Sequence, residues 1–218
     1  MENKKIIESF SSGRCPICAL LRQDEFDYIC EWVGVSDAKY RKAEKRIGLV
    51  KSKGFCNYHF WEFEHVSTHY GSAQVCIGFI EELIDILQNE KRENQFLNLQ
   101  EYHHSLNCPL CADLKINESS HIEDLITLLD SQGNRTKYAK GWGLCIPHLI
   151  QTVLYANDES LTSFLLDSQK KQLERIKINA VGLIRKKEAP LRWEQTDDEK
   201  NSWFRAIQKL AGRRGQKN

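Results

Sequence analysis

The chain has 218 residues, of which 41% are hydrophobic and 28% charged, and its 31 basic side chains nearly balance 30 acidic ones. Its 4 prolines and 12 glycines are too few for a collagen-like or low-complexity disordered protein. A formal net charge of +1 argues against a surface devoted to nucleic acid or an anionic membrane. The unusual feature is eight cysteines beside a single methionine.

The N-terminal segment lacks the pattern of a targeting sequence. A signal peptide needs a continuous apolar stretch of about 7–15 residues, and residues 1–15 contain none. The most apolar stretch, residues 75–87, carries acidic side chains, so we expect no membrane span. We therefore expect a cytoplasmic protein with reduced thiols, in which the cysteines indicate metal or redox chemistry rather than disulfides.

In the first half, apolar residues recur at the three-and-four spacing of helices. We expect helices over residues 17–33 and 38–50, and a long helical stretch after residue 59 with an interruption at Gly71 and Ser72. The polar segment 88–100 is expected to bridge the two halves. No segment alternates convincingly between apolar and polar residues, so the predicted fold class is all-α.

The second half shows the same periodicity. We expect helices over 113–129, after Cys145 and over 160–187, with a turn at 131–134. Thr196 and Glu199 have the spacing of a capping box that opens a last helix. We expect its apolar side to pack on the bundle, with a partner-binding helix or a phosphate-contacting tail as alternatives. The apolar side consists of Trp203, Phe204, Ile207 and Leu210.

Two motifs occur twice in the same order. Cys-Pro-x-Cys begins at Cys15 and Cys108, and Gly-x-Cys-x-x-His begins at Gly54 and Gly143. Similar intervals separate the motifs in both halves, which indicates an internal repeat. The expected architecture is a helical bundle with a first metal module over residues 1–90, a second over 91–156, and a C-terminal helical extension over 157–218 packed on the bundle.

The repeated residues suit a metal ion, because three thiolates and one imidazole are a common tetrahedral zinc shell. A following helix can point its N-terminal amides at the thiolates, and a glycine two residues before a cysteine can let the chain bend closely. We expect each half to supply one complete, closed set that holds a structural Zn²⁺ ion. The predicted ligands are Cys15, Cys18, Cys56 and His59 in the first half, and Cys108, Cys111, Cys145 and His148 in the second.

Other chemistries remain alternatives. The same cysteines and histidines could hold an iron–sulfur cluster or serve thiol redox reactions. An enzyme could use an interhelical pocket lined by Trp32, Trp61 or Trp142. The Glu-x-x-His spacing of carboxylate di-iron proteins occurs at 62–65, 101–104 and 118–121, where solvated helix faces are the simpler interpretation.

The remaining features concern the core and the partners. Cys30 and Cys76 have no counterpart in the other half and are expected in the core. With no dominant charge, another protein is the expected partner. Nucleic acid is a weaker candidate, through the basic segment Lys39–Lys53 and through Arg213 and Arg214.

At the two motif pairs, and at the C-terminal segment Ser202–Gly212 with its Ser-Trp start and Ala-Gly end, the chain resembles an uncharacterised bacterial family, a domain of unknown function. The resemblance covers nearly the whole chain and implies two metal-binding halves followed by a serine–tryptophan helix. It implies no activity. The expected function is therefore a zinc-stabilised binding or adaptor module rather than an enzyme.

Overall fold

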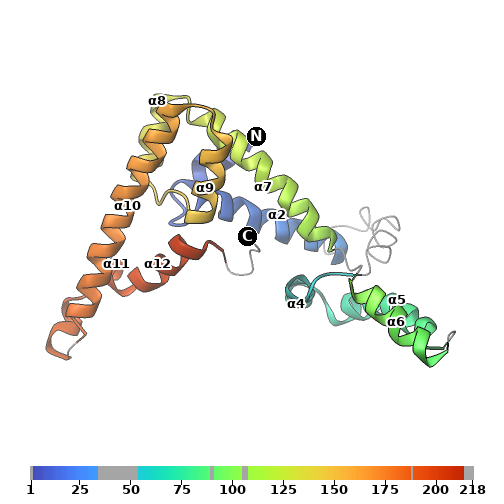
Figure 1. Cartoon of the computed structure of the whole chain (residues 1–218). Coiled ribbons are helices and arrows are strands. Elements are labelled where there is room, and N and C mark those ends of the chain that lie inside the picture. Colours follow the sequence, from blue (N-terminus) through green and yellow to red (C-terminus); the bar gives the residue numbers. More distant parts are fainter. Residues whose placement is uncertain (1, 34–53, 89–90, 105–107, 188, 214–218) are drawn as a thin grey trace. The chain divides into compact units, whose positions relative to one another are not determined.

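The computed structural model describes residues 2–33, 54–88, 91–104, 108–187 and 189–213 (Figure 1). Within these ranges every regular element is a helix, which confirms the all-α prediction, and no helix is long and apolar enough to cross a membrane. The helices are α1 (Glu2–Ser9), α2 (Pro16–Val33), α4 (Asn57–Val66), α5 (His69–Gln88), α6 (Arg92–His104), α7 (Pro109–Leu128), α8 (Gln132–Lys140), α9 (Ile146–Tyr155), α10 (Glu159–Arg185), the 3-10 helix η2 (Ala189–Glu194), α11 (Asp197–Lys200) and α12 (Ser202–Ala211).

The chain divides into two compact units. The first unit comprises Met1–Leu21 together with Glu118–Asn218, and the second comprises Arg22–Asn117. Helices α2 and α7 therefore each contribute residues to both units. The expected division into residues 1–90, 91–156 and 157–218 stays a prediction.

An aromatic cluster forms the core of the second unit. The Phe60 ring lies edge-on to both Phe55 and Phe79, with centroids 5.6 and 5.9 Å apart. Such edge-to-face pairs stabilise a core beyond the burial of their area. Ile29 of α2 and Leu110 of α7 are buried in the same cluster. The core thus joins α2, α4 and α5 to the start of α7.

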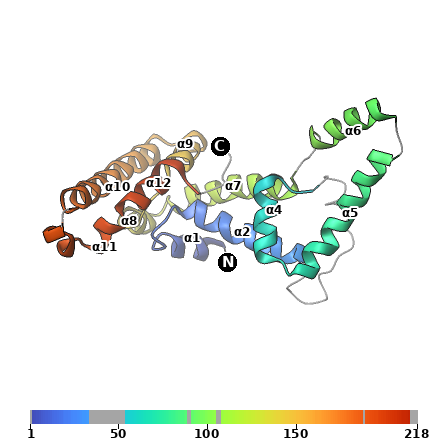
Figure 2. The same cartoon turned by 90° about the horizontal axis from the view of Figure 1, so that it is seen from below.

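The first unit is built around the long helix α10. Helices α9 and α12 both contact α10, as Figures 1 and 2 show. Leu161 and Leu165 of α10 are fully buried, as is Tyr138 of α8. The Phe10 ring lies edge-on to Tyr138 at 5.6 Å, which connects the end of α1 with α8.

Several predicted helix boundaries differ from the structure. The break after residue 59 falls between Val66 and His69 rather than at Gly71, because the Thr68 hydroxyl accepts the Gly71 N–H at 3.1 Å and so caps α5. The predicted turn at 131–134 is mostly the first turn of α8. The predicted bridge over 88–100 is largely helix α6, which packs against α5. The helix expected over 38–50 lies outside the described residues.

The predicted capping box is present. The Thr196 hydroxyl accepts the Glu199 N–H at 3.2 Å, and the Glu199 carboxylate accepts the Thr196 N–H at 2.8 Å. Such a pair satisfies two of the free amides at a helix start. The helix that it opens, α11, ends after one turn, and α12 begins beyond Asn201.

Helix α12 packs on the first unit by the face opposite to the one expected. Ser202 and Lys209 are its buried residues, whereas the four predicted packing residues are between 49% and 64% exposed (Trp203, Phe204, Ile207 and Leu210). The expectation that they pack into the bundle is therefore wrong. The physical reason is that Lys209 donates hydrogen bonds to the Trp142 carbonyl oxygen and to Gln172 Oε1. These bonds hold the Lys209 side of the helix against the bundle, so the apolar side faces outward.

Candidate metal centres

The eight predicted ligands gather into two groups of four. Within the described ranges these are the only clusters of three or more His, Cys, Asp or Glu side chains with metal-binding geometry, and the four ligand atoms of each lie within 4.8 Å of one another. The outer site contains Cys15, Cys18, Cys145 and His148. The inner site contains Cys56, His59, Cys108 and Cys111.

The expectation that each half supplies its own complete set is wrong. The Cys-Pro-x-Cys motif of each half meets the Cys-x-x-His motif of the other half. The reason lies in the carboxylate that holds each histidine. Glu25 lies 3.1 Å from His59 but is ten residues, or about 15 Å along the helix axis, beyond Cys15. His59 therefore meets Cys108 and Cys111 at the start of α7 rather than Cys15 and Cys18.

Each ligand pair occupies the start of a helix. Cys56 and Cys145 are the N-cap residues of α4 and α9, with nearly identical backbone angles (φ −66°, ψ 165° and φ −72°, ψ 164°). Cys15 and Cys108 directly precede α2 and α7, which begin with prolines. The second ligand follows three residues later in every case, close to one helical turn. Each site therefore joins two helix N-termini, where the peptide dipoles favour negative sulfur.

The two glycines before the Cys-x-x-His motifs have positive φ angles, which agrees with the close bend expected there. Gly54 has φ +102° and Gly143 has φ +74°, in the region where only glycine is unstrained. A Cβ atom at Gly143 would also overlap the Gln172 side-chain amide. Glycine is thus needed there both for its conformation and for its size.

In the outer site, the imidazole faces three sulfur atoms. The Nδ1 atom of His148 lies 3.3 Å from Cys15 Sγ, 3.4 Å from Cys18 Sγ and 3.1 Å from Cys145 Sγ. The Cys18 and Cys145 sulfurs are 3.8 Å apart. A tetrahedron with Zn–S bonds of about 2.3 Å has sulfur separations of about 3.8 Å.

The inner site repeats this arrangement. His59 Nδ1 lies 3.3 Å from Cys56 Sγ, 3.2 Å from Cys108 Sγ and 3.3 Å from Cys111 Sγ, and the Cys56 and Cys111 sulfurs are 3.7 Å apart. The sites differ in burial, because all four outer ligands are buried, whereas Cys56 and Cys111 are only half-buried.

Crowding of the thiols pushes their pKa values apart. Burial would raise the pKa of Cys15, but hydrogen bonds with Cys145, Cys18 and His148 bring it well below the usual value. Hydrogen bonds with Cys145 and Cys15 instead raise the pKa of Cys18. In the inner site, the pKa of Cys108 falls to about 6 despite burial, because His59 and backbone amides bond its sulfur. A cation at the centre would let all the sulfurs ionise.

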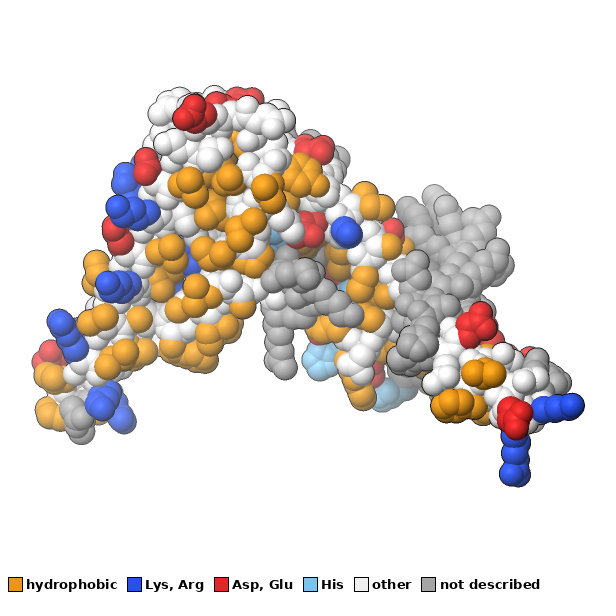
Figure 3. Space-filling model, viewed as in Figure 1, with side chains coloured by type: hydrophobic (Ala, Val, Ile, Leu, Met, Phe, Trp, Pro, Cys, Tyr) orange, Lys and Arg blue, Asp and Glu red, His pale blue; other side chains and the backbone are white. Residues whose placement is uncertain are grey.

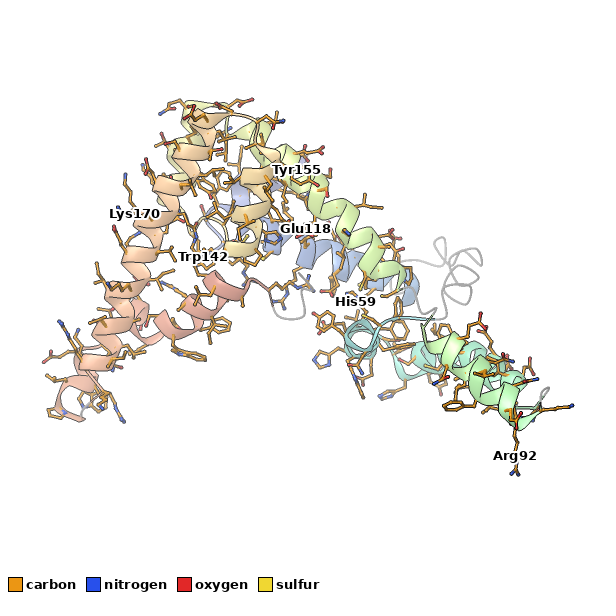
Figure 4. All side chains as sticks on the ribbon, in the orientation of Figure 1. His59, Arg92, Glu118, Trp142, Tyr155 and Lys170 are labelled. Atoms are coloured by element: carbon orange, nitrogen blue, oxygen red, sulfur yellow. The ribbon has the colours of Figure 1, made fainter. Side chains whose placement is uncertain are left out.

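A carboxylate holds the far nitrogen of each histidine. Nε2 of His148 lies 2.8 Å from Glu118 Oε1, and Nε2 of His59 lies 3.1 Å from Glu25 Oε1. Such a carboxylate fixes the ring orientation and leaves Nδ1 as the ligand atom. In Figure 4, Glu118 lies on α7.

Neither glutamate belongs to the predicted site, although a signal for both is present in the sequence. Glu25 follows Cys15 by ten residues, and Glu118 follows Cys108 by ten. Glu118 was expected only as part of a Glu-x-x-His pattern with His121. Extending the repeat comparison past the cysteines would have found both carboxylates.

The other sequence candidates do not join a cluster. Cys30 and Cys76 are half-buried free thiols and lie outside both groups. No Glu-x-x-His pair forms a di-iron cluster among the described residues. Trp61 is 66% exposed, whereas Trp142 lines a pocket. The Trp32 side chain, the segment Lys39–Lys53 and Arg214 lie outside what the structure describes.

Comparison with protein families gives a match over nearly the whole chain. The sequence model of a family described as "Family of unknown function (DUF6062)" matches residues 5–217. The chain therefore belongs to this family, as the resemblance at its motifs led us to expect. The comparisons with curated proteins and with solved structures found no match.

Proposed function

We propose that the chain is a cytoplasmic zinc-binding protein whose two Cys3His sites stabilise a protein-binding module. Cys15, Cys18, Cys145 and His148 would hold one ion, and Cys56, His59, Cys108 and Cys111 the other. The carrying observation is the set of four convergent ligand atoms in each group. The similar backbone angles of Cys56 and Cys145 further support an internal repeat.

The spacing of the ligand atoms supports zinc over an iron–sulfur cluster. Sulfur separations of 3.7 and 3.8 Å suit one tetrahedral ion, and a cluster of two or more irons needs a larger space between its cysteines. Thiol redox chemistry with Cys-x-x-Cys is typical of a βαβ context, and every described element here is a helix.

The coordination also supports a structural role. A catalytic zinc has three protein ligands and an open position for water or substrate, whereas each group here offers four protein ligands. Structural zinc contributes about 10–16 kcal/mol to the folding of small domains. Two such sites would link α2, α4, α7 and α9 through their N-termini.

An exposed apolar surface in the first unit supports a protein partner. Figure 3 shows hydrophobic side chains gathered over α9, α10 and α12. Helices α9 and α12 contact each other. We call the exposed hydrophobic side chains of these two helices the apolar surface. Exposed hydrophobic side chains that gather on one face are typical of interaction sites. The apolar surface consists of Ile150, Leu154, Trp203, Phe204, Ile207 and Leu210.

Metal content tests the first part of the proposal. Protein purified in reducing buffer without added metal should contain two zinc ions per chain by elemental analysis, and a chelator should lower its melting temperature. Cys18→Ser should lose one ion, whereas Cys30→Ser, a matched change outside both groups, should retain two. Metal-free protein that melts identically with and without chelator, or an absorption band at about 400 nm, as iron–sulfur clusters show, would contradict the zinc assignment.

Binding tests the second part. A protein captured by the tagged chain would be purified and its affinity measured directly by calorimetry. Trp203→Ser combined with Ile207→Ser should abolish this binding, because both side chains are exposed. Ile116→Ser, also exposed but on α7, should leave it unchanged. Equal binding by the wild-type chain, the double variant and Ile116→Ser would exclude the apolar surface as the docking site.

A further inference from the structure

A pocket of about 430 Å³ opens in the first unit between the end of α1, α8, α10, α11 and α12. Its size falls within the range of small-molecule sites. Two features distinguish it from an ordinary surface hollow: cations converge on it from several helices, and buried hydrogen-bond donors in its wall lack acceptors. Neither feature is used by the metal centres.

The pocket lining carries an excess of positive charge. Lys137 and Lys140 come from the last turn of α8, Arg175 comes from α10, and Arg205 comes from α12. Asp198 is the acidic residue of the lining, and its carboxylate accepts a hydrogen bond from Arg205 at 2.6 Å. The two lysines also offset the negative end of the α8 dipole, but that effect does not account for the two arginines.

A buried lysine fixes the wall of this pocket. Lys209 is fully buried and donates to the Trp142 carbonyl oxygen at 2.7 Å and to Gln172 Oε1 at 3.0 Å. Its ammonium also lies 4.1 Å from the centroid of the Trp142 ring. Because Oε1 of Gln172 accepts this hydrogen bond, the amide nitrogen of Gln172 faces away from Lys209.

Two donors in the pocket wall have no acceptor in the described part of the chain. Gln172 is 3% exposed, and its Nε2 atom has no hydrogen-bond partner among the described residues. The Trp142 indole N–H also has no partner there. Both residues line the pocket. Buried donors are normally bonded, so two unsatisfied N–H groups beside a cationic hollow indicate a missing acceptor.

We propose that this pocket binds a small phosphate-bearing anion of about nucleotide size. Guanidinium groups such as those of Arg175 and Arg205 match phosphate oxygens in a two-point geometry. Phosphate oxygens also supply the acceptors that Gln172 Nε2 and the Trp142 indole lack. A concave site bounded by several helices favours a compact ligand over an extended polymer.

Calorimetric titration of the zinc-loaded chain with ATP and with inorganic pyrophosphate tests this proposal. Arg175→Glu should weaken binding about 10- to 100-fold, the usual range for losing a charge-assisted hydrogen bond. Lys140→Glu, on another helix, provides a second test should the first variant misfold. Lys170→Glu is the matched control, because Lys170 is exposed on α10 and lies on the side away from Trp142 (Figure 4).

The outcomes separate the pocket from general electrostatics. Binding that is lost in Arg175→Glu and Lys140→Glu but kept in Lys170→Glu supports the proposal. The absence of ATP and pyrophosphate binding, or an equal loss in Lys170→Glu, overturns it. Binding of a single-stranded oligonucleotide with no binding of ATP or pyrophosphate also overturns it, since the ligand would then be an extended polymer.

Discussion

The carboxylate behind each histidine offers a direct measure of how the protein tunes metal affinity. His148 is fully buried, its Nε2 lies 2.8 Å from Glu118, and only 17% of the Glu118 side chain is exposed. Glu118→Ala should weaken zinc binding at the outer site about 10- to 100-fold, or about 1.4–2.8 kcal/mol. The reason is that the imidazole loses the acceptor that orients it and that increases the basicity of Nδ1.

Competition with a chromophoric zinc chelator measures both sites in one titration. In Glu118→Ala the outer-site step should move to lower chelator concentration, while the inner-site step stays as an internal reference. Glu25→Ala should give the reverse pattern, because Glu25 holds His59. Glu123→Ala, an exposed change on the same helix as Glu118, is the control for helix perturbation.

The same titration can refute the reasoning. If Glu118→Ala left both steps unchanged, the carboxylate would contribute nothing to the ligand geometry. If it weakened the step that Cys56→Ser abolishes, the assignment of Glu118 to the outer site would be wrong. A loss equal to that in Glu123→Ala would mean only that α7 had been destabilised.

The remaining predictions concern ligand pairing, backbone, charge and reactivity. Cys18→Ser with Cys145→Ser should leave one zinc per chain by elemental analysis, whereas Cys18→Ser with Cys56→Ser should leave none; the reverse would refute the crossed pairing. Gly143→Ala should cost about 1–3 kcal/mol in urea unfolding of the zinc-loaded chain, because φ there is +74°; an unchanged midpoint would contradict this. Burial lowers the pKa of Lys209 to about 7, below its value of about 10.4 in the unfolded chain. Between these pKa values the unfolded chain binds more protons than the folded chain. The free energy of unfolding of the wild type should therefore rise with pH from about 7 to 10, by up to about 1.4 kcal/mol per pH unit relative to Lys209→Met; the same pH dependence in both proteins would exclude a lowered Lys209 pKa. A thiol-modifying reagent should release the inner-site metal first, since two inner ligands are half-buried; simultaneous release would argue against control by exposure.

The sequence was most informative where a local rule decides the structure. The predicted capping box at Thr196 and Glu199 is present, and the bend expected at Gly54 and Gly143 agrees with their positive φ angles. Both features follow from short-range stereochemistry. The ligand types were equally readable, because Cys-Pro-x-Cys and Cys-x-x-His occur at helix starts whose geometry is local.

Features that depend on long-range contacts were not predictable in this way. Nothing within either half indicates that Cys18 meets Cys145, 127 residues away. The orientation of α12 was misjudged for a similar reason. Its apolar stripe predicts a buried face containing Trp203, but Lys209 forms buried hydrogen bonds to Trp142 and Gln172, and neither acceptor can be recognised from the helix sequence.

The crossed ligand sets also determine the order in which binding sites become complete during synthesis. The inner set is complete once Cys111 has been made, whereas Cys15 and Cys18 wait for Cys145 and His148. His148 lies 130 residues after Cys18, and at 5–20 residues per second the ribosome needs on the order of ten seconds to make this stretch. During that interval the nascent chain offers Cys15 and Cys18 a nearer cysteine and histidine, Cys56 and His59. The pairing that is closest along the sequence is therefore a kinetic competitor of the native one, and a chain that forms it must exchange ligands before it reaches its final structure.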